Sequence, residues 1–414
     1  MKKLAPSKPY IFFFSLLYLC LVLLMPKASH EWDMSCWKNW SIYIFDHGIQ
    51  HVYECGTDYL PLYHYILWFF GKIQGSVSNI ERNIYTLKSI TLFFDFVTGM
   101  AIIALLQQKI QNKYKVLTLS LLFLLNAGIL YNTLIWGQVD GIMTSVLFLS
   151  FYFGYTKSPF TSMVFLLLAL NFKLQSIIFV PFIGLLILPD IIQTTFKKIL
   201  GGISVIVLLQ IFILLPFILE GNTPLVWDVV KNSFGKYPQI SMNAYNLWFI
   251  LCNKSTVWKN DNQPFIGAIS YKTFGMILFF LTSFLALFPL IKSTLISISK
   301  KTPLRFSLEN YLLTATLLPL LFFFVNTQMH ERYSHPAFAF LITYSILSGR
   351  YYLAVLGTVC YFLNLEDVLR YLQLPNYKTV IFTPIFISIL YLMLIILLFS
   401  ALYKRQTATS PVPK

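Results

Sequence analysis

Long runs of apolar residues alternate with short polar connections along the whole chain. Runs such as Ile11–Leu24, Leu117–Leu130, Ile203–Leu219 and Ile381–Leu402 are continuous and rich in Leu, Ile and Phe. Apolar runs of about 20 residues are long enough to cross a bilayer as helices. The pattern predicts about twelve crossings, near residues 9–26, 87–106, 115–131, 139–156, 159–171, 175–189, 200–219, 266–291, 308–325, 335–348, 351–365 and 380–403.

Composition supports this interpretation. Of the 414 residues, 57% are hydrophobic and only 11% are charged, so the chain is far more apolar than a soluble domain. A transmembrane barrel would instead need many short strands of alternating polarity. We therefore predict an all-α polytopic membrane protein that forms a single domain over residues 1–414.

The formal net charge of +15 would suggest a nucleic-acid partner for a soluble protein. Here the basic residues sit in short connections between apolar runs, which is the bias that marks cytoplasmic loops. We therefore expect no nucleic-acid partner and place the N-terminus inside. The residues that carry this bias include Lys2, Lys3, Lys113, Lys197, Lys301, Arg305 and Lys414.

Acidic residues follow the opposite distribution. Asp95, Asp190 and Glu309 fall within a span or inside, and the rest of the 16 acidic residues lie at or beyond the outer face. Asp95 suits either a proton relay or pairing with a neighbouring helix. Four polar segments reach the outer face, where a catalytic cleft would have to be built: residues 30–33, 58–61, 136–140 and 330–333.

Two large outer loops are expected, and the first should carry two helices. Apolar positions recur at helical spacing over Trp37–His47, which predicts a helix lying in the membrane interface. A second helix is expected over Pro61–Gly71, because proline suits a first helical turn. These helices would frame Asp33 and Asp58. The loops cover residues 27–86 and 220–265.

The first loop resembles that of the GT-C glycosyltransferases. Asp33-Met-Ser-Cys-Trp-Lys-Asn-Trp40 keeps the family spacing of Asp, six residues and Trp, and Gly56-Thr-Asp-Tyr-Leu-Pro-Leu62 resembles its Asp-Tyr-Pro-Pro-Leu motif. The ER dolichyl-phosphate-glucose glucosyltransferases and bacterial proteins resembling GPI mannosyltransferases are the most similar. Further matches follow in the family order, at Tyr131-Asn132, Asp140, Asn171-Phe-Lys-Leu-Gln175, Asn243-Ala-Tyr-Asn-Leu-Trp248 and His330-Glu331-Arg332.

Two positions depart from the family pattern. Leu60 replaces the first proline of the Pro-Pro pair, which leaves a less rigid turn beside Asp58. Arg332 stands where the ER enzymes have lysine, which keeps the charge but replaces a point donor with a planar fork. Neither change removes a carboxylate.

The resemblance implies an inverting hexosyltransferase that uses a polyprenyl- or dolichyl-phosphate sugar, with mannose expected first and glucose second. Asp33 would be the base that takes the proton of the acceptor hydroxyl. Fixed positive charge would stabilise the leaving phosphate, and Arg332, His330 and Lys173 are the candidates. Lys173 lies between two apolar runs, where a lysine is costly unless it meets an anion or reaches the interface. The other substrate-binding candidates are Trp40, Asp58, Tyr59, Gln138, Asp140 and Glu331.

These assignments have structural alternatives. Asp58 is equally suited to capping the helix at Pro61, and Asp140 to capping or anchoring the fourth span. His330 and Glu331 are able to pair with each other. Two roles are open for Trp136, Trp227, Trp248 and Trp258: aromatic platforms for a sugar, or an aromatic belt at the membrane interface, which is favoured.

We expect no metal and no cofactor. No His/Cys spacing resembles a zinc site, no Asp-x-Asp pair occurs in the chain, and the related ER enzymes are thought to work without metal. A bridge between Cys36 and Cys55 would close a loop of about 20 residues, worth roughly 3 kcal/mol in the chain-entropy model. The sequence leaves that bridge open.

Two other function classes remain open. A transporter or flippase of a lipid-linked sugar would show two similar halves, which are not evident here. A polysaccharide polymerase would show arginine-rich outer loops, and only Arg82, Arg332 and Arg370 lie there. The expected partners are a lipid-phosphate sugar and a lipid-linked or surface glycan acceptor. The expected location is a bacterial inner membrane with the site outside, or the ER membrane in a eukaryote.

Overall fold

The computed structural model describes residues 8–233, 235–252, 255–302 and 306–408. Lys2, Lys3, Arg305 and Lys414, used above for topology, lie outside these ranges. Within them the chain is helical apart from a short hairpin of β1 (Pro264–Ile266) and β2 (Ile269–Ser270), together with isolated bridges. The all-α prediction is therefore confirmed.

Seven helical segments of the described chain are long and apolar enough to cross a membrane, which is consistent with a multi-pass membrane protein. An eighth is reached if α6 (Lys113–Leu124) is joined to the segment Ala127–Trp136 across a bend of 47°. The twelve predicted crossings are not confirmed. The seven segments are Val77–Leu106, Leu174–Ile192, α11 (Phe196–Glu220), α14 (Tyr271–Lys300), α15 (Leu308–Val325), α17 (Tyr351–Leu369) and α18 (Pro384–Ala408).

The other predicted crossings correspond to shorter helices. At 1.5 Å per residue, a helix of 14 residues spans roughly 21 Å, less than the roughly 30 Å of a bilayer core. These helices are α1 (Lys8–Leu23), α8 (Asp140–Tyr155), α9 (Pro159–Phe172) and α16 (Ala337–Ser348).

The chain forms two compact units. The first contains α1, α2 (Glu31–His47), η1 (Ile49–Cys55), α3 (Pro61–Gln74), α8, α9, α11 and α12 (Thr223–Asn232). Within it α2 packs on α3 and η1, and α8 packs on α9. The unit comprises residues 1–101, 132–183 and 190–236.

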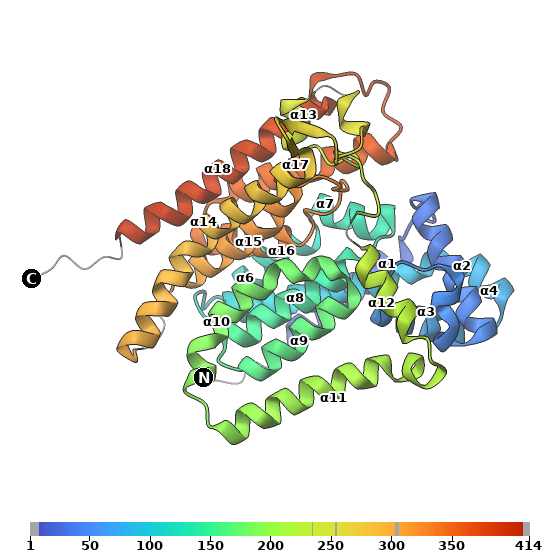
Figure 1. Cartoon of the computed structure of the whole chain (residues 1–414), viewed down its shortest axis with the longest axis horizontal. Coiled ribbons are helices and arrows are strands. Elements are labelled where there is room, and N and C mark those ends of the chain that lie inside the picture. The colour runs from blue at the N-terminus through green and yellow to red at the C-terminus, as the bar shows by residue number, and fades with distance from the viewer. Residues whose placement is uncertain (1–7, 234, 253–254, 303–305, 409–414) are drawn as a thin grey trace, which may run out of the picture. The chain divides into compact units, whose positions relative to one another are not determined.

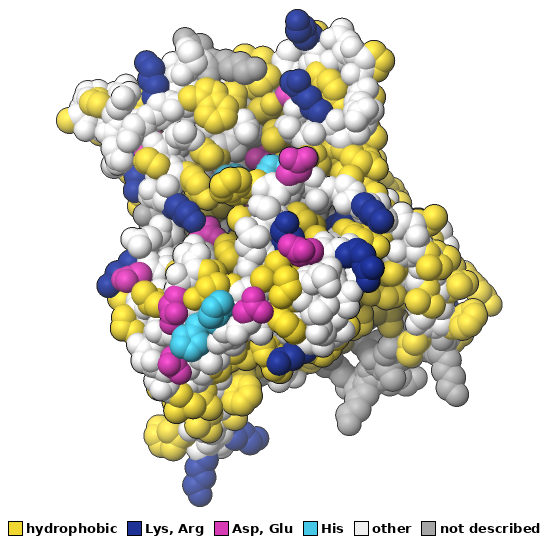
Figure 2. Space-filling view, turned by 90° about the vertical axis from the view of Figure 1, so that its right-hand side faces the viewer, with side chains coloured by type: hydrophobic (Ala, Val, Ile, Leu, Met, Phe, Trp, Pro, Cys, Tyr) yellow, Lys and Arg dark blue, Asp and Glu magenta, His cyan; other side chains and the backbone are white. Residues whose placement is uncertain are grey.

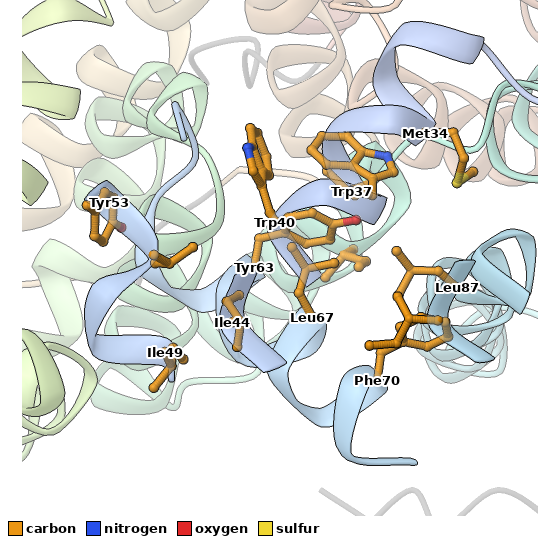
Figure 3. Close-up of a cluster of buried hydrophobic side chains, with 14 of the residues drawn as sticks. Met34, Trp37, Trp40, Ile44, Ile49, Tyr53, Tyr63, Leu67, Phe70 and Leu87 are labelled. Atoms are coloured by element: carbon orange, nitrogen blue, oxygen red, sulfur yellow. The ribbon is translucent and has the colours of Figure 1, made fainter. Parts of the chain in front are cut away.

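The predicted helices of the first outer loop are present, and they share a core of their own (Figure 3). Trp37, Trp40 and Ile44 of α2 are buried against Tyr63 and Leu67 of α3. The apolar stripe of α2 is therefore covered by protein. We had expected that stripe to lie in the membrane interface, and its packing on α3 explains the same spacing.

The second unit contains α13 (Leu247–Leu251) and the helices α14 to α18. α15 packs against α14, α16 and α18, and α17 packs against α16 and α18 (Figure 1). Nearly every residue of α15 and α16 is buried, whereas α14 keeps many apolar side chains exposed. The central helices thus carry no polar stripe, because protein surrounds them on all sides.

Candidate functional site

Asp33 lies in the first turn of α2, with 14% of its side chain exposed. We had predicted that this helix begins at Trp37, but it begins at Glu31. Glu31 and Asp33 favour that earlier start, because acidic side chains are stabilised in a first helical turn. The proposed catalytic carboxylate therefore stands on a helix.

Three nitrogen atoms converge on one oxygen of Asp33. Trp136 donates its indole N–H to Oδ2 at 2.9 Å, and Gln138 donates its side-chain amide to the same oxygen. The Nδ1 atom of His30 lies 3.0 Å from Oδ2. The His30 ring also stacks on the Trp136 indole, with centroids 4.9 Å apart and 16° between the planes. The carboxylate is thus held from two segments of the chain.

The backbone brings these segments together. The N–H of His30 donates to the carbonyl of Trp136 at 3.0 Å, and the indole of Trp37 donates to the carbonyl of Gly137 at 3.3 Å. Gly137 has φ 84°, and a Cβ there would lie 2.7 Å from the Met34 methyl. A side chain at Gly137 would therefore be strained by the positive φ, and the Met34 methyl would have to move.

Lys88 joins the same two segments. Its side chain is buried, and Nζ donates to the carbonyls of Pro26 at 2.6 Å, Ala28 at 2.7 Å and Leu134 at 2.7 Å. An ammonium group has three N–H donors, so these bonds use all of them. The lysine therefore ties the chain before His30 to the chain before Trp136. The sequence analysis missed this residue, whose only visible signal is a charge at the edge of an apolar run.

Asp58 forms an ion pair with Lys236 and does not cap α3. The N-cap of α3 is Leu60, which makes no side-chain capping bond, so the capping alternative for Asp58 is wrong. The charges of this pair and of Asp33 act on the same thiol. Burial raises the pKa of Cys36, and the charges of Asp33 and Asp58 raise it further while Lys236 lowers it.

Asp140 and Lys173 form a second ion pair, with 2.7 Å between Oδ1 and Nζ. Asp140 is the first residue of α8, and the N-cap is Val139, so Asp140 does not cap the helix but anchors it through this ion pair. The sequence predicts that Lys173 needs an anion, and the Asp140 carboxylate is that anion. The side chain of Lys173 is 14% exposed and that of Asp140 is 2% exposed. The pair secures the end of α9 to the start of α8.

Trp40 and Tyr59 belong to the aromatic core of the first loop. Trp40 is buried, with its ring centroid 5.2 Å from that of Trp37 and 5.6 Å from that of Tyr59. His64 is packed edge-on against Trp40, and burial lowers the pKa of its imidazole to about 3. In this packing Trp40 holds α2 to the turn around Tyr59.

The second unit holds His330, Glu331 and Arg332 together. Arg332 donates to Glu331 at 2.7 Å, and His330 Nδ1 lies 4.0 Å from the same carboxylate. His330 and Glu331 therefore do pair, as the structural alternative predicts, but at the long distance of 4.0 Å. His330 also packs edge-on against Tyr237, with 5.2 Å between ring centroids. Backbone bridges from Met242 and Asn243 fix the position of His330.

Three carboxylates that sequence reasoning left without a role are tied into the second unit. Asp261 is buried and accepts hydrogen bonds from Thr327 at 2.6 Å and Gln328 at 2.8 Å, just before His330. Asp367 accepts a hydrogen bond from Tyr245. Burial, and then this bond, raise the pKa of the phenol. Glu366 accepts bonds from two tyrosines, Tyr131 and Tyr377.

Asp95 pairs within its own unit. Its Oδ2 accepts a hydrogen bond from the Thr133 hydroxyl at 2.7 Å, and a Cβ on Gly141 would lie 2.5 Å from its Oδ1. The contact places Asp95 against the segment that leads to Trp136. This is the neighbouring-helix alternative of the sequence analysis.

All five cysteines, Cys36 and Cys55 among them, carry free thiols. Among the described residues, no group of three or more His, Cys, Asp or Glu side chains is arranged to hold a metal ion. Figure 2 shows acidic, basic and histidine side chains among hydrophobic ones on one face of the molecule. No protein-family model matches the chain, and no curated protein matches it significantly.

Proposed function

We propose that this protein is an inverting glycosyltransferase of the GT-C type. It transfers a hexose from a polyprenyl- or dolichyl-phosphate to a lipid-linked or surface glycan at the non-cytoplasmic face of a membrane. Mannose is the first candidate sugar and glucose the second. The proposal includes the twelve crossings expected from hydropathy and a bacterial inner membrane, or the ER membrane in a eukaryote.

The observation that carries the proposal is the environment of Asp33. N–H donors from Trp136 and Gln138 point at one carboxylate oxygen at the start of α2. Such donors favour the charged carboxylate, which is the form that a proton-accepting site requires. The ordered motif resemblance over residues 30–340 then supplies the reaction class.

The first experiment is transfer from purified polyprenyl-phosphate mannose and polyprenyl-phosphate glucose to extracted membrane glycolipids. Wild type should use one donor, and Asp33→Asn should bind that donor with little change while losing transfer by orders of magnitude. No transfer by wild type, with equal donor binding by both proteins, would favour a transporter of a lipid-linked sugar.

Arg332 is the proposed contact of the donor phosphate. The Arg332→Ala variant should weaken donor binding, because an arginine fork offers two parallel N–H donors to phosphate oxygens. Arg82→Ala, at an exposed arginine of α4 (Val77–Asn83), is the matched control. Wild-type donor affinity in Arg332→Ala would remove the phosphate assignment.

A further inference from the structure

His30 makes two contacts that assign opposite roles to its Nδ1 atom. The backbone N–H of Asp33 lies 3.4 Å from Nδ1, which would make Nδ1 an acceptor and His30 the N-cap of α2. The Oδ2 atom of Asp33 lies 3.0 Å from the same nitrogen, which requires a proton between them. The position of that proton decides what the ring is able to do.

The neighbours of Oδ2 settle the position of the proton. An indole N–H is only a donor, so the bond from Trp136 fixes Oδ2 as an acceptor. The amide of Gln138 donates to the same oxygen. Two N–H donors stabilise the carboxylate charge, and an Nδ1 lone pair at 3.0 Å from that charge would be repelled. Nδ1 therefore carries the proton and donates it to Asp33.

The proton on Nδ1 determines the state of the other ring nitrogen, Nε2. A neutral imidazole with its proton on Nδ1 has a lone pair on Nε2. A carboxylate bonded to Nδ1–H holds the ring in this tautomer and stabilises the cation that forms when Nε2 accepts a proton. The ring is further fixed by its stacking on Trp136. The side chain of His30 is 31% exposed, whereas that of Asp33 is 14% exposed.

We infer that His30 and Asp33 act as a dyad in which Nε2 of His30 accepts the proton of the acceptor hydroxyl and Asp33 orients the ring. The inference rests on the proposed glycosyl transfer. The acceptor oxygen forms a bond to the anomeric carbon, and its proton passes to Nε2. The bond from that carbon to the phosphate oxygen breaks, and its electron pair leaves with the lipid phosphate. Asp33 remains a carboxylate throughout.

The dyad predicts a transfer rate that rises with pH where an imidazole titrates, at about pH 5–8, because Nε2 must be unprotonated. Glu31 and Asp33 are the acidic groups in the first turn of α2, and the Lys88 ammonium is bonded to the carbonyl of Ala28, two residues before His30. The charges of Asp33, Asp58 and Lys236 all act on the Cys36 thiol of α2. Tyr63 of α3 also senses Asp33, and burial first and then that charge raise the pKa of its phenol. Replacing His30 with a residue that takes up no proton therefore decides whether the rise belongs to its imidazole.

The test compares His30→Asn with wild type in the transfer assay from pH 5 to 8.5. Asparagine is a strong N-cap whose side-chain oxygen accepts from backbone N–H groups of the first turn, so α2 retains its start. It lacks the second ring nitrogen. We expect a loss of about 10²–10⁴-fold in transfer, the usual contribution of a general base, together with loss of the rise with pH. His47→Asn, at an exposed histidine in the last turn of α2, is the control and should match wild type.

The His30→Ala variant supplies a second readout, because added imidazole should restore part of its activity and no merely structural role predicts such rescue. Transfer by His30→Asn within about fivefold of wild type, with the same pH profile, would overturn the dyad and leave Asp33 as the direct base. Absence of transfer by wild type from either donor would overturn the proposed function and the dyad with it.

Discussion

At the scale of single residues, the candidate site is defined by hydrogen bonds to one carboxylate oxygen. Sequence resemblance identified Asp33 and Gln138. It gave no role to His30 or Trp136, because their contacts depend on the path of the backbone between α2 and residue 136. His30 had a local signal, a polar residue just before two acids at a helix start.

We predict that Trp136→Phe lowers transfer without unfolding the protein. Phenylalanine keeps an aromatic ring against His30 but removes the N–H that Oδ2 accepts at 2.9 Å. A hydrogen bond to a charged group contributes about 1.5–3 kcal/mol, so the rate should fall about 10- to 100-fold. The measurement is the initial rate of transfer. Trp227→Phe, at a tryptophan that is 57% exposed, is the control, and equal rates in the two variants would contradict the role of the indole.

At the scale of elements, the sequence placed the two helices of the first loop and their apolar positions. It placed the start of α2 six residues too late, because the first turn carries two acids and its hydrogen-bond partners, Trp136 and Gln138, are distant in the sequence. The sequence also did not reveal the partners of Asp58 and Asp140, which lie at the starts of α3 and α8. Aspartate is common at helix N-caps, but in the structure these two residues form ion pairs with Lys236 and Lys173.

Lys88→Met should destabilise the protein. The change leaves the carbonyls of Pro26, Ala28 and Leu134 without their ammonium donor, and each buried group that loses its partner costs about 1–3 kcal/mol. We expect a clear fall in the midpoint of thermal unfolding in detergent. Lys72→Met changes an exposed lysine of α3 and should leave the midpoint unchanged. If both variants unfold at the same midpoint temperature as wild type, Lys88 does not tie the segments together.

His64 should make the packing of α3 sensitive to acid. Burial lowers the pKa of its imidazole to about 3, whereas the unfolded chain takes up the proton near the ordinary value of about 6.5. The stabilisation is therefore complete above that ordinary value and is lost as pH falls from it towards about 3. One pKa unit corresponds to about 1.4 kcal/mol, so the loss by pH 5 is on the order of 2 kcal/mol.

The measurement is the unfolding midpoint at pH 7.5 and pH 5 for wild type and His64→Gln. Glutamine keeps a polar group near the Thr57 hydroxyl and the Tyr59 carbonyl but takes up no proton. The acid-induced fall should be smaller in the variant. An equal fall of the midpoint in both proteins would show that His64 is not the source of the acid sensitivity.

At the scale of the whole molecule, the positive-inside pattern predicts which connections face each side of the membrane. Asn262→Cys and Lys301→Cys place thiols at exposed positions before and after α14. In a background without the five native cysteines, a membrane-impermeant maleimide should label position 262 from the outside and position 301 from the inside. Labelling of both from one side would contradict the predicted topology and the outer location of the site.

The sequence by itself determined the helical class, the apolar segments and the chemistry available at Asp33. Those properties follow from local composition and spacing, which a chain carries without folding. The tertiary structure alone decided that unit 1 is assembled from three separated stretches of chain. It also decided that Lys173 is matched by Asp140 and that the side chains of Trp136 and Gln138 donate to Asp33. These contacts join residues 33, 103 and 105 positions apart. No periodicity encodes them, because they arise only when buried polar groups must find partners.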